Sequence, residues 1–100
     1  NNLIKITIMK NQLQHCIDMV KDWVGNEYLY FDTALQVKHS PHHFPFTIWG
    51  LCVSPTDTLY VMDSDQQWYA LDAATGSDDM VIGSIYQRLK WMGAKYAKAS

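Results

Sequence analysis

Large apolar side chains alternate on both faces of residues 58–72, and no other pattern in the chain is as informative. The segment predicts two strands joined by a polar turn. Leu59 and Val61 share one face of the first strand. Tyr60 and Met62 share the other face. An antiparallel sheet with one solvated face carries apolar residues on one side only. We therefore expect the second face to be covered by a helix, a second subunit or a partner.

A stripe of apolar residues at helical spacing precedes this hairpin near the N-terminus. Its members are Leu13, Cys16, Ile17, Val20, Trp23 and Val24. Gly25 follows at the position where helices commonly end in a left-handed residue. We therefore predict a helix that ends at about Val24.

The beginning of this helix is open to three interpretations. Ile6 and Met9 continue the stripe backwards and favour one long helix from about Leu3. The alternation of residues 4–8 is instead typical of a strand, and a capping box at residues 11–14 would start a shorter helix. We favour the long helix, because a strand would leave too few residues to turn the chain.

The rest of the chain predicts two more strands and a second helix. Residues 27–38 alternate, with a bend expected near Thr33–Ala34, and residues 46–53 form the next strand. The first of these strands carries Leu29, Phe31, Leu35 and Val37 on one face and Tyr28, Tyr30, Asp32 and Gln36 on the other. After a linker at residues 73–77, a second helical stripe contains Val81, Ile82, Ile85, Leu89, Met92 and Tyr96. Gly83 lowers the helix propensity there by about 1 kcal/mol relative to alanine, and we expect it to let a neighbouring backbone approach closely.

These elements predict a single α+β domain that spans residues 1–100. It has an N-terminal helix, a four-stranded antiparallel meander and a C-terminal helix, because short links favour the pairing of consecutive strands. Two helices on one face of the sheet would leave the other face open.

Composition narrows the functional classes. Of the 100 residues, 48% are hydrophobic, 13% aromatic and 18% charged, and the net charge is −2. The charged fraction lies below the roughly 25% of typical domains, which suggests aromatic surface buried between molecules. Two cysteines are too few for a disulfide framework, and neither a secretory signal nor a membrane-spanning run is recognisable. We expect a cytoplasmic protein with reduced thiols and no membrane association.

Charge is unevenly distributed along the chain. Every charged residue from Asp57 to Asp79 is acidic, and every one from Arg88 to Lys98 is basic. The basic segment contains Arg88, Lys90, Trp91, Lys95, Tyr96 and Lys98. Cations between aromatic residues suit single-stranded nucleic acid, which is the alternative function. We do not expect a nucleic-acid partner, because the cations are few and fit the C-terminal end of a helix dipole.

Histidines in one loop are the best candidates for a metal site. His39, His42 and His43 could converge on a zinc or nickel ion, but their spacing matches none of the recurrent zinc patterns. Residues 63–65 begin like a calcium loop and lack its later ligands, so we expect their carboxylates to cap the hairpin turn. The sequence therefore predicts no cofactor and no metal site.

No nucleophile has a partner at a suitable position. His15 precedes Cys16 directly, and adjacent side chains on a helix diverge by about 100°, so the two would not face each other. Cys16 falls on the apolar stripe and is expected to be buried. The sequence predicts no catalytic residue, and a small enzyme remains only an alternative.

A protein-interaction or assembly module is the remaining hypothesis. Tyr60, Met62 and Trp68 would have no cover if both helices packed on the opposite face of the sheet. Tyrosine, tryptophan and methionine are enriched at the centres of protein interfaces. We therefore predict that these three residues bind a protein partner or a second copy of the chain, most simply in a twofold homodimer.

Overall fold

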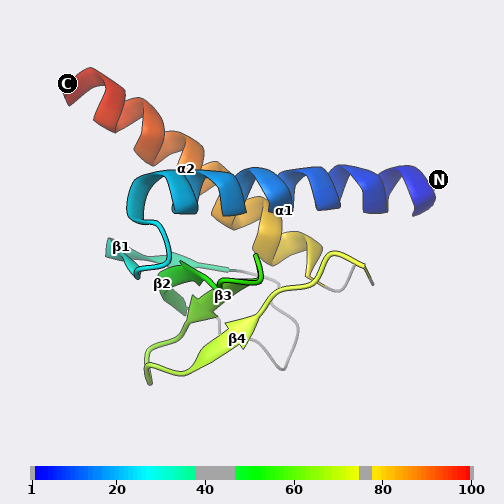
Figure 1. Ribbon diagram of the computed structural model, residues 1–100, viewed down its shortest axis with the longest axis horizontal. Helices are drawn as coiled ribbons and strands as arrows, with labels where there is room; N and C mark the ends of the chain where they lie inside the picture. Colours follow the sequence, from blue (N-terminus) through cyan, green and yellow to red (C-terminus); the bar gives the residue numbers. More distant parts are fainter. Residues whose placement is uncertain (1, 38–46, 75–77, 100) are drawn as a thin grey trace.

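The chain folds as two helices and a four-stranded antiparallel sheet (Figure 1), which confirms the predicted α+β class. The computed structural model describes residues 2–37, 47–74 and 78–99, and the side chains of residues 8, 10–37, 47–74 and 78–94. In chain order the elements are α1 (Asn2–Val24), β1 (Leu29–Gln36), β2 (Thr47–Val53), β3 (Leu59–Met62), β4 (Trp68–Ala70) and α2 (Asp79–Ala99). Because α1 starts at Asn2, the long helix is confirmed, and the strand and short-helix alternatives are wrong.

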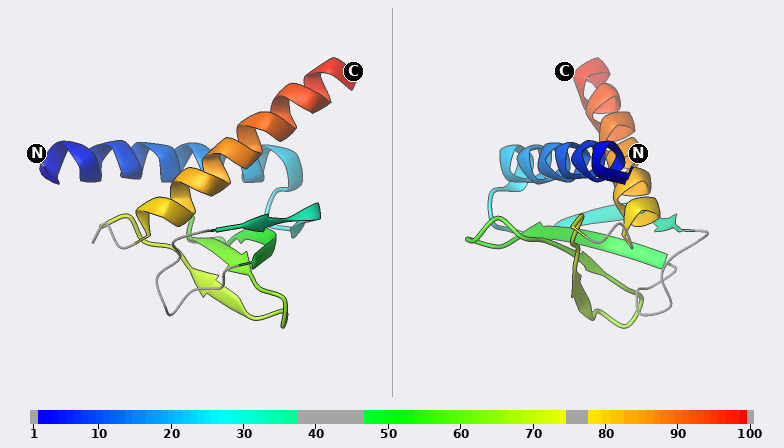
Figure 2. Two further views of the ribbon diagram at one scale, coloured as in Figure 1. Left: turned by 180° about the vertical axis from the view of Figure 1, so that it is seen from behind. Right: turned by 90° about the vertical axis from the view of Figure 1, so that its right-hand side faces the viewer.

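Both helices lie on the same side of the sheet and cross each other there (Figure 2). The strands follow the order β1-β2-β3-β4, so each strand pairs with its neighbour in the sequence. The Cα radius of gyration is 13.0 Å, the value of a compact chain of this length. Within the described residues, neither helix has a stretch long and apolar enough to cross a membrane.

The core fills the space between the helices and the sheet face that they cover. Leu51 pairs with Val61, and Val53 pairs with Leu59, so these four side chains point to the same face. All four are at most 1% exposed. The helices contribute the predicted stripes, of which Cys16, Ile17, Val20, Val81, Ile82, Ile85 and Leu89 are buried. Burial of a Val, Leu or Ile side chain contributes about 1.5–3 kcal/mol, so these stripes explain why the helices dock on this face.

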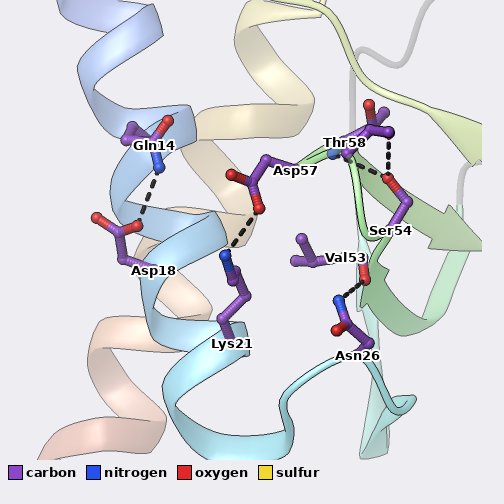
Figure 3. Close-up of polar contacts among 9 residues, drawn as sticks. Gln14, Asp18, Lys21, Asn26, Val53, Ser54, Asp57 and Thr58 are labelled. Atoms are coloured by element: carbon purple, nitrogen blue, oxygen red, sulfur yellow. Dashed lines mark hydrogen bonds and ion pairs between the residues drawn. The ribbon is translucent and has the colours of Figure 1, made fainter.

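The C-terminal end of α1 is fixed to the turn between β2 and β3 (Figure 3). Gly25 has a φ of +64°, as its position after the helix predicted. Asn26 then donates a 2.9 Å hydrogen bond from Nδ2 to the carbonyl of Val53. Lys21 Nζ lies 2.8 Å from Asp57 Oδ1, and this hydrogen bond and charge raise the pKa of Lys21. Both partners are exposed, so solvent and salt screen the ion pair and its contribution to stability is small.

A wide bulge interrupts β1. Tyr30 lies opposite Gly50 and Leu35 opposite Ile48, so five steps along β1 match two steps along β2. Arg88 of α2 donates hydrogen bonds to the carbonyls of Thr33 at 2.6 Å and Ala34 at 3.3 Å. The predicted bend at Thr33–Ala34 is thus confirmed as a bulge. The guanidinium of Arg88 donates hydrogen bonds to two backbone carbonyls in this bulge and thereby gives them partners.

Gly83 of α2 does not have the role that the sequence predicted for it. A Cβ added at Gly83 would meet no atom within 4 Å, so the expected close approach of a backbone is wrong. Gly83 instead faces an open hollow of about 780 Å³ beside Gln12 and Met80. At Gly93 the two helices are in contact, because an added Cβ would lie 3.4 Å from the ring of Trp23 in α1, an ordinary packing distance.

Candidate partner-binding face of the sheet

One row of residues crosses all four strands on the sheet face that carries no helix. Tyr30 pairs with Gly50, Gly50 with Met62, and Met62 with Trp68. Because side chains alternate along a strand, this row points away from the face that holds the core. The neighbouring pair Cys52 and Tyr60 shares its direction with the row. We call this side of the sheet the outer face.

Gly50 lets the side chains of the row close over the centre of the sheet. An added Cβ would lie 3.2 Å from both Tyr30 Cδ1 and the carbonyl oxygen of Leu29. The methyl group of Met62 would be 3.5 Å away. Tyr30 and Met62 therefore lean over the glycine from both sides, and Gly50 is buried by them.

Aromatic rings from the two edges of the sheet meet on the outer face. The ring centroids of Tyr28, which precedes β1, and Trp68 of β4 are 5.0 Å apart, with their planes tilted by 35°. Tyr28 also meets Tyr30 edge to face at a centroid distance of 6.0 Å. Such aromatic pairs contribute about 0.5–1.5 kcal/mol beyond their area burial. The outer face is thus an ordered aromatic surface even though no helix covers it.

The predicted site residues lie together on this face, but they are not its most exposed members. Trp68, Tyr60 and Met62 are half-buried, and the ring of Tyr28 lies against Trp68. Tyr28 and Tyr30 are 54% and 56% exposed, and Trp49 is 38% exposed. The sequence placed Tyr28 and Tyr30 on the strand face opposite Leu29 and Phe31, and the predicted site did not include them. Because Tyr28 and Tyr30 are two residues apart, their side chains point to the same strand face. Only the strand register shows that this face is also the face of Met62 and Trp68.

A hollow of about 350 Å³ opens on the outer face beside this aromatic surface. Tyr30, Phe31, Trp49 and Met62 form its aromatic and apolar side, and Asp63, Ser64 and Gln66 from the β3–β4 turn form its polar side. The β1 bulge shapes the hollow, because Trp49 lies opposite the extra residues of β1. The hollow is therefore lined by three aromatic residues and by one acidic residue, Asp63.

Asp63 organises the turn at the polar side of the hollow. Its Oδ1 accepts hydrogen bonds of 2.9 Å from the backbone N–H groups of Asp65 and Gln67. Its Oδ2 accepts a 3.1 Å hydrogen bond from the Tyr69 hydroxyl. Partial desolvation raises the pKa of Asp63, but these hydrogen bonds outweigh it and the net pKa is lowered. The expected turn-capping role is confirmed, and the carboxylate is ionised at neutral pH.

Acidic charge is concentrated in the sheet layer. Residues 27–37 and 47–74 contain no lysine or arginine, and their charged residues are Glu27, Asp32, Asp57, Asp63, Asp65 and Asp72. All lysines and arginines of the chain except Lys38 belong to α1 or α2. The domain is therefore polarised, with an acidic sheet layer and a more basic helical layer.

The described cations of α2 have contacts within the chain. Arg88 binds the carbonyls of the β1 bulge and lies over the Phe31 ring, with Cζ 5.0 Å from the ring centroid. Lys90 Nζ lies 5.2 Å from the ring centroid of Tyr86. The side chains of Lys95 and Lys98 lie outside the described part of the chain. The alternative nucleic-acid site therefore loses Arg88, whose guanidinium holds the fold.

Both cysteines are free thiols, and neither has the environment of a nucleophile. Burial raises the pKa of Cys16 to about 12. Desolvation also raises the pKa of Cys52, which is half-buried on the outer face. His15 is exposed and its ring stacks on Tyr86 at 6.1 Å, so it does not face Cys16. A thiolate is disfavoured at both positions.

No cluster of three or more His, Cys, Asp or Glu that could hold a metal ion occurs among the described residues. The loop with His39, His42 and His43 lies outside them. The outer face is therefore the site that the geometry builds from the predicted residues.

Comparison of the chain with protein-family models, curated proteins and solved structures returned no match.

Proposed function

We propose that the chain is a protein-interaction module and that the outer face is its binding surface. The observation that carries this proposal is the exposure of Tyr28 and Tyr30 on a sheet face that neither helix covers, beside the hollow that the exposed Trp49 lines. Large aromatic side chains supply most of the binding energy in many interfaces, because they bury a large area and lose little conformational entropy.

The order of these rings supports the proposal. Tyr28 is held between Trp68 and Tyr30, and Tyr30 rests over Gly50. A surface whose side chains are already fixed avoids part of the entropic cost of about 0.5–1.5 kcal/mol per immobilised side chain on binding. The outer face is therefore prepared to bind without rearranging.

Charge and thiol chemistry favour a binding role over the alternatives. The acidic sheet layer repels phosphate groups, which disfavours nucleic acid on the outer face. Cys52 on this face has a raised pKa and is thereby a weak nucleophile. A protein is the class of ligand that suits an aromatic surface with an acidic border. The partner could be a second copy of the chain in a twofold homodimer, and this form of the proposal can be tested with the purified chain alone.

Two tryptophans provide a matched test. Trp49 lines the hollow beside Tyr30 and Met62, whereas Trp91 lies on α2, and both are exposed, at 38% and 58%. The immobilised chain is first used to capture its partner protein from extracts of its native cell. We expect Trp49→Ala to weaken the binding of this partner by about 30-fold, as for an interface hot spot. Trp91→Ala should leave that binding unchanged.

Circular dichroism and a cooperative unfolding transition must first show that both variants are folded. Tyr30→Ala, which truncates a ring that is 56% exposed, repeats the test on another strand. Sedimentation of the pure chain reports self-association in the same variants. Equal capture by the wild type, Trp49→Ala and Tyr30→Ala would refute the proposal.

A further inference from the structure

The hollow on the outer face combines two groups that attract cations. The ring faces of Tyr30 and Trp49 carry the negative side of the aromatic quadrupole. Asp63 adds a carboxylate, and the hydrogen bonds described for it come from neutral donors, the N–H groups of Asp65 and Gln67 and the Tyr69 hydroxyl. These bonds orient the carboxylate but leave its negative charge in place.

The surroundings of the hollow strengthen this preference. The sheet layer at residues 27–37 and 47–74 has six carboxylates and no lysine or arginine. A ligand cation therefore meets acidic neighbours. Arg88 of α2 contacts Phe31, which is one of the residues that line the hollow. Because the guanidinium of Arg88 already lies over the ring of Phe31, a ligand cation can contact only the other two aromatic rings of the hollow, those of Tyr30 and Trp49.

We propose that this hollow binds an arginine or lysine side chain from a basic segment of a partner protein. The inference rests on the proposed function of the outer face and names the kind of partner that fits it. Arginine suits the hollow best, because a planar guanidinium stacks on aromatic rings while it donates hydrogen bonds to a carboxylate. The residues that flank the cation in the partner lie on the aromatic surface of Tyr28, Tyr30 and Trp68.

A second copy bound through the same face is the competing occupant. In a twofold dimer both outer faces would bring acidic borders to the interface, and neither sheet layer would supply a lysine or arginine to complement them. A basic segment instead complements that border. The charge pattern thus favours a different protein over the twofold homodimer.

Two matched peptides test the inference with the full chain. One is a fluorescein-labelled peptide in which arginine alternates with glycine and serine, and the other has citrulline, a neutral analogue, in place of arginine. Fluorescence anisotropy should show that the wild type binds the arginine peptide about fivefold more tightly, as a cation–π contact contributes. The difference should shrink as salt is added, because the carboxylates are exposed to screening.

Variants of the hollow locate the contact. Asp63→Asn keeps Oδ1 as the acceptor for the turn and removes the charge, so it should weaken the arginine peptide about two- to fivefold and leave the citrulline peptide unchanged. Asp65→Asn removes a charge from the same turn outside the hollow and is the control. Tyr30→Leu should weaken the arginine peptide by a similar factor, whereas Tyr30→Phe, which keeps the ring, should not.

Equal binding of the two peptides, or binding of neither, would overturn the inference. So would a dimer of the pure chain that Trp49→Ala dissociates, because the occupant would then be a second copy. Each of these results leaves the proposed function intact, since that function is tested by the loss of partner capture in Trp49→Ala. If Trp49→Ala and Tyr30→Ala both capture partners normally, the proposed function and this inference fail together.

Discussion

Removing the guanidinium of Arg88 should destabilise the fold through the β1 bulge. Arg88→Met keeps most of the aliphatic stem but loses the hydrogen bonds to the carbonyls of Thr33 and Ala34. The bond to Thr33 is short, at 2.6 Å, and charge-assisted. Such bonds contribute about 1.5–3 kcal/mol, and the lower value applies here because Thr33 is exposed and water can replace the donor.

The contact with Phe31 adds to this loss. A cation over an aromatic ring contributes about 0.5–1 kcal/mol, and the guanidinium lies 5.0 Å from the ring centroid. Together the two effects predict a decrease of about 2 kcal/mol in the free energy of unfolding. For a domain of this size, that decrease corresponds to a fall of about 8–16 °C in Tm.

Urea unfolding followed by tryptophan fluorescence measures this change. Lys90→Met is the control, because it removes a cation two residues further along the same helix, and its contact with Tyr86 should contribute no more than about 0.5 kcal/mol. Arg88→Lys should recover only part of the loss, since an ammonium group cannot bind two carbonyls as a planar fork. If Arg88→Met is no less stable than Lys90→Met, the guanidinium does not hold the bulge.

Three further predictions concern other parts of the fold. Gly83→Ala should raise the free energy of unfolding by up to about 1 kcal/mol in the same urea assay, because the new methyl group meets no atom within 4 Å. Cys16 should react with a thiol reagent only after denaturation, and rapid labelling in the folded state would contradict its burial. Cys52 should react in the folded state, but more slowly than an exposed cysteine. The pKa of Asp63 is lower in the folded than in the unfolded chain, so its contribution to stability is present above the unfolded pKa of about 3.9 and is lost as the pH falls through the folded pKa. Unfolding measured between neutral and acidic pH should therefore show a weaker acid dependence in Asp63→Asn than in the wild type.

The helices and the hairpin could be predicted because their signals are local. The stripe from Leu13 to Val24 has the period of a helix, and Gly25 has the positive φ that ends it. The alternation of residues 58–62 gave the faces of β3 correctly, with Leu59 and Val61 in the core. These patterns depend on residues a few positions apart, so the sequence alone specifies them.

The candidate site could be predicted only in part, because it depends on contacts between distant segments. Tyr28 meets Trp68 across forty positions of sequence, and only the strand register brings them together. The bend of β1 was expected, but its size and its contact with Arg88 follow from the packing of α2. The hollow beside Trp49 depends on that bulge and therefore had no local signal.

The bulge also affects the edge of the sheet. The unpaired backbone of an edge strand can recruit strands from other molecules, which leads to edge-to-edge aggregation. Here β4 is only three residues long, and β1 is eight residues long but loses its regular register at the bulge. Neither edge offers a long straight template for a further strand. The domain can therefore expose an aromatic face without offering an edge for open-ended polymerisation. Under the proposed function, recognition would rest on side chains rather than on the addition of a strand.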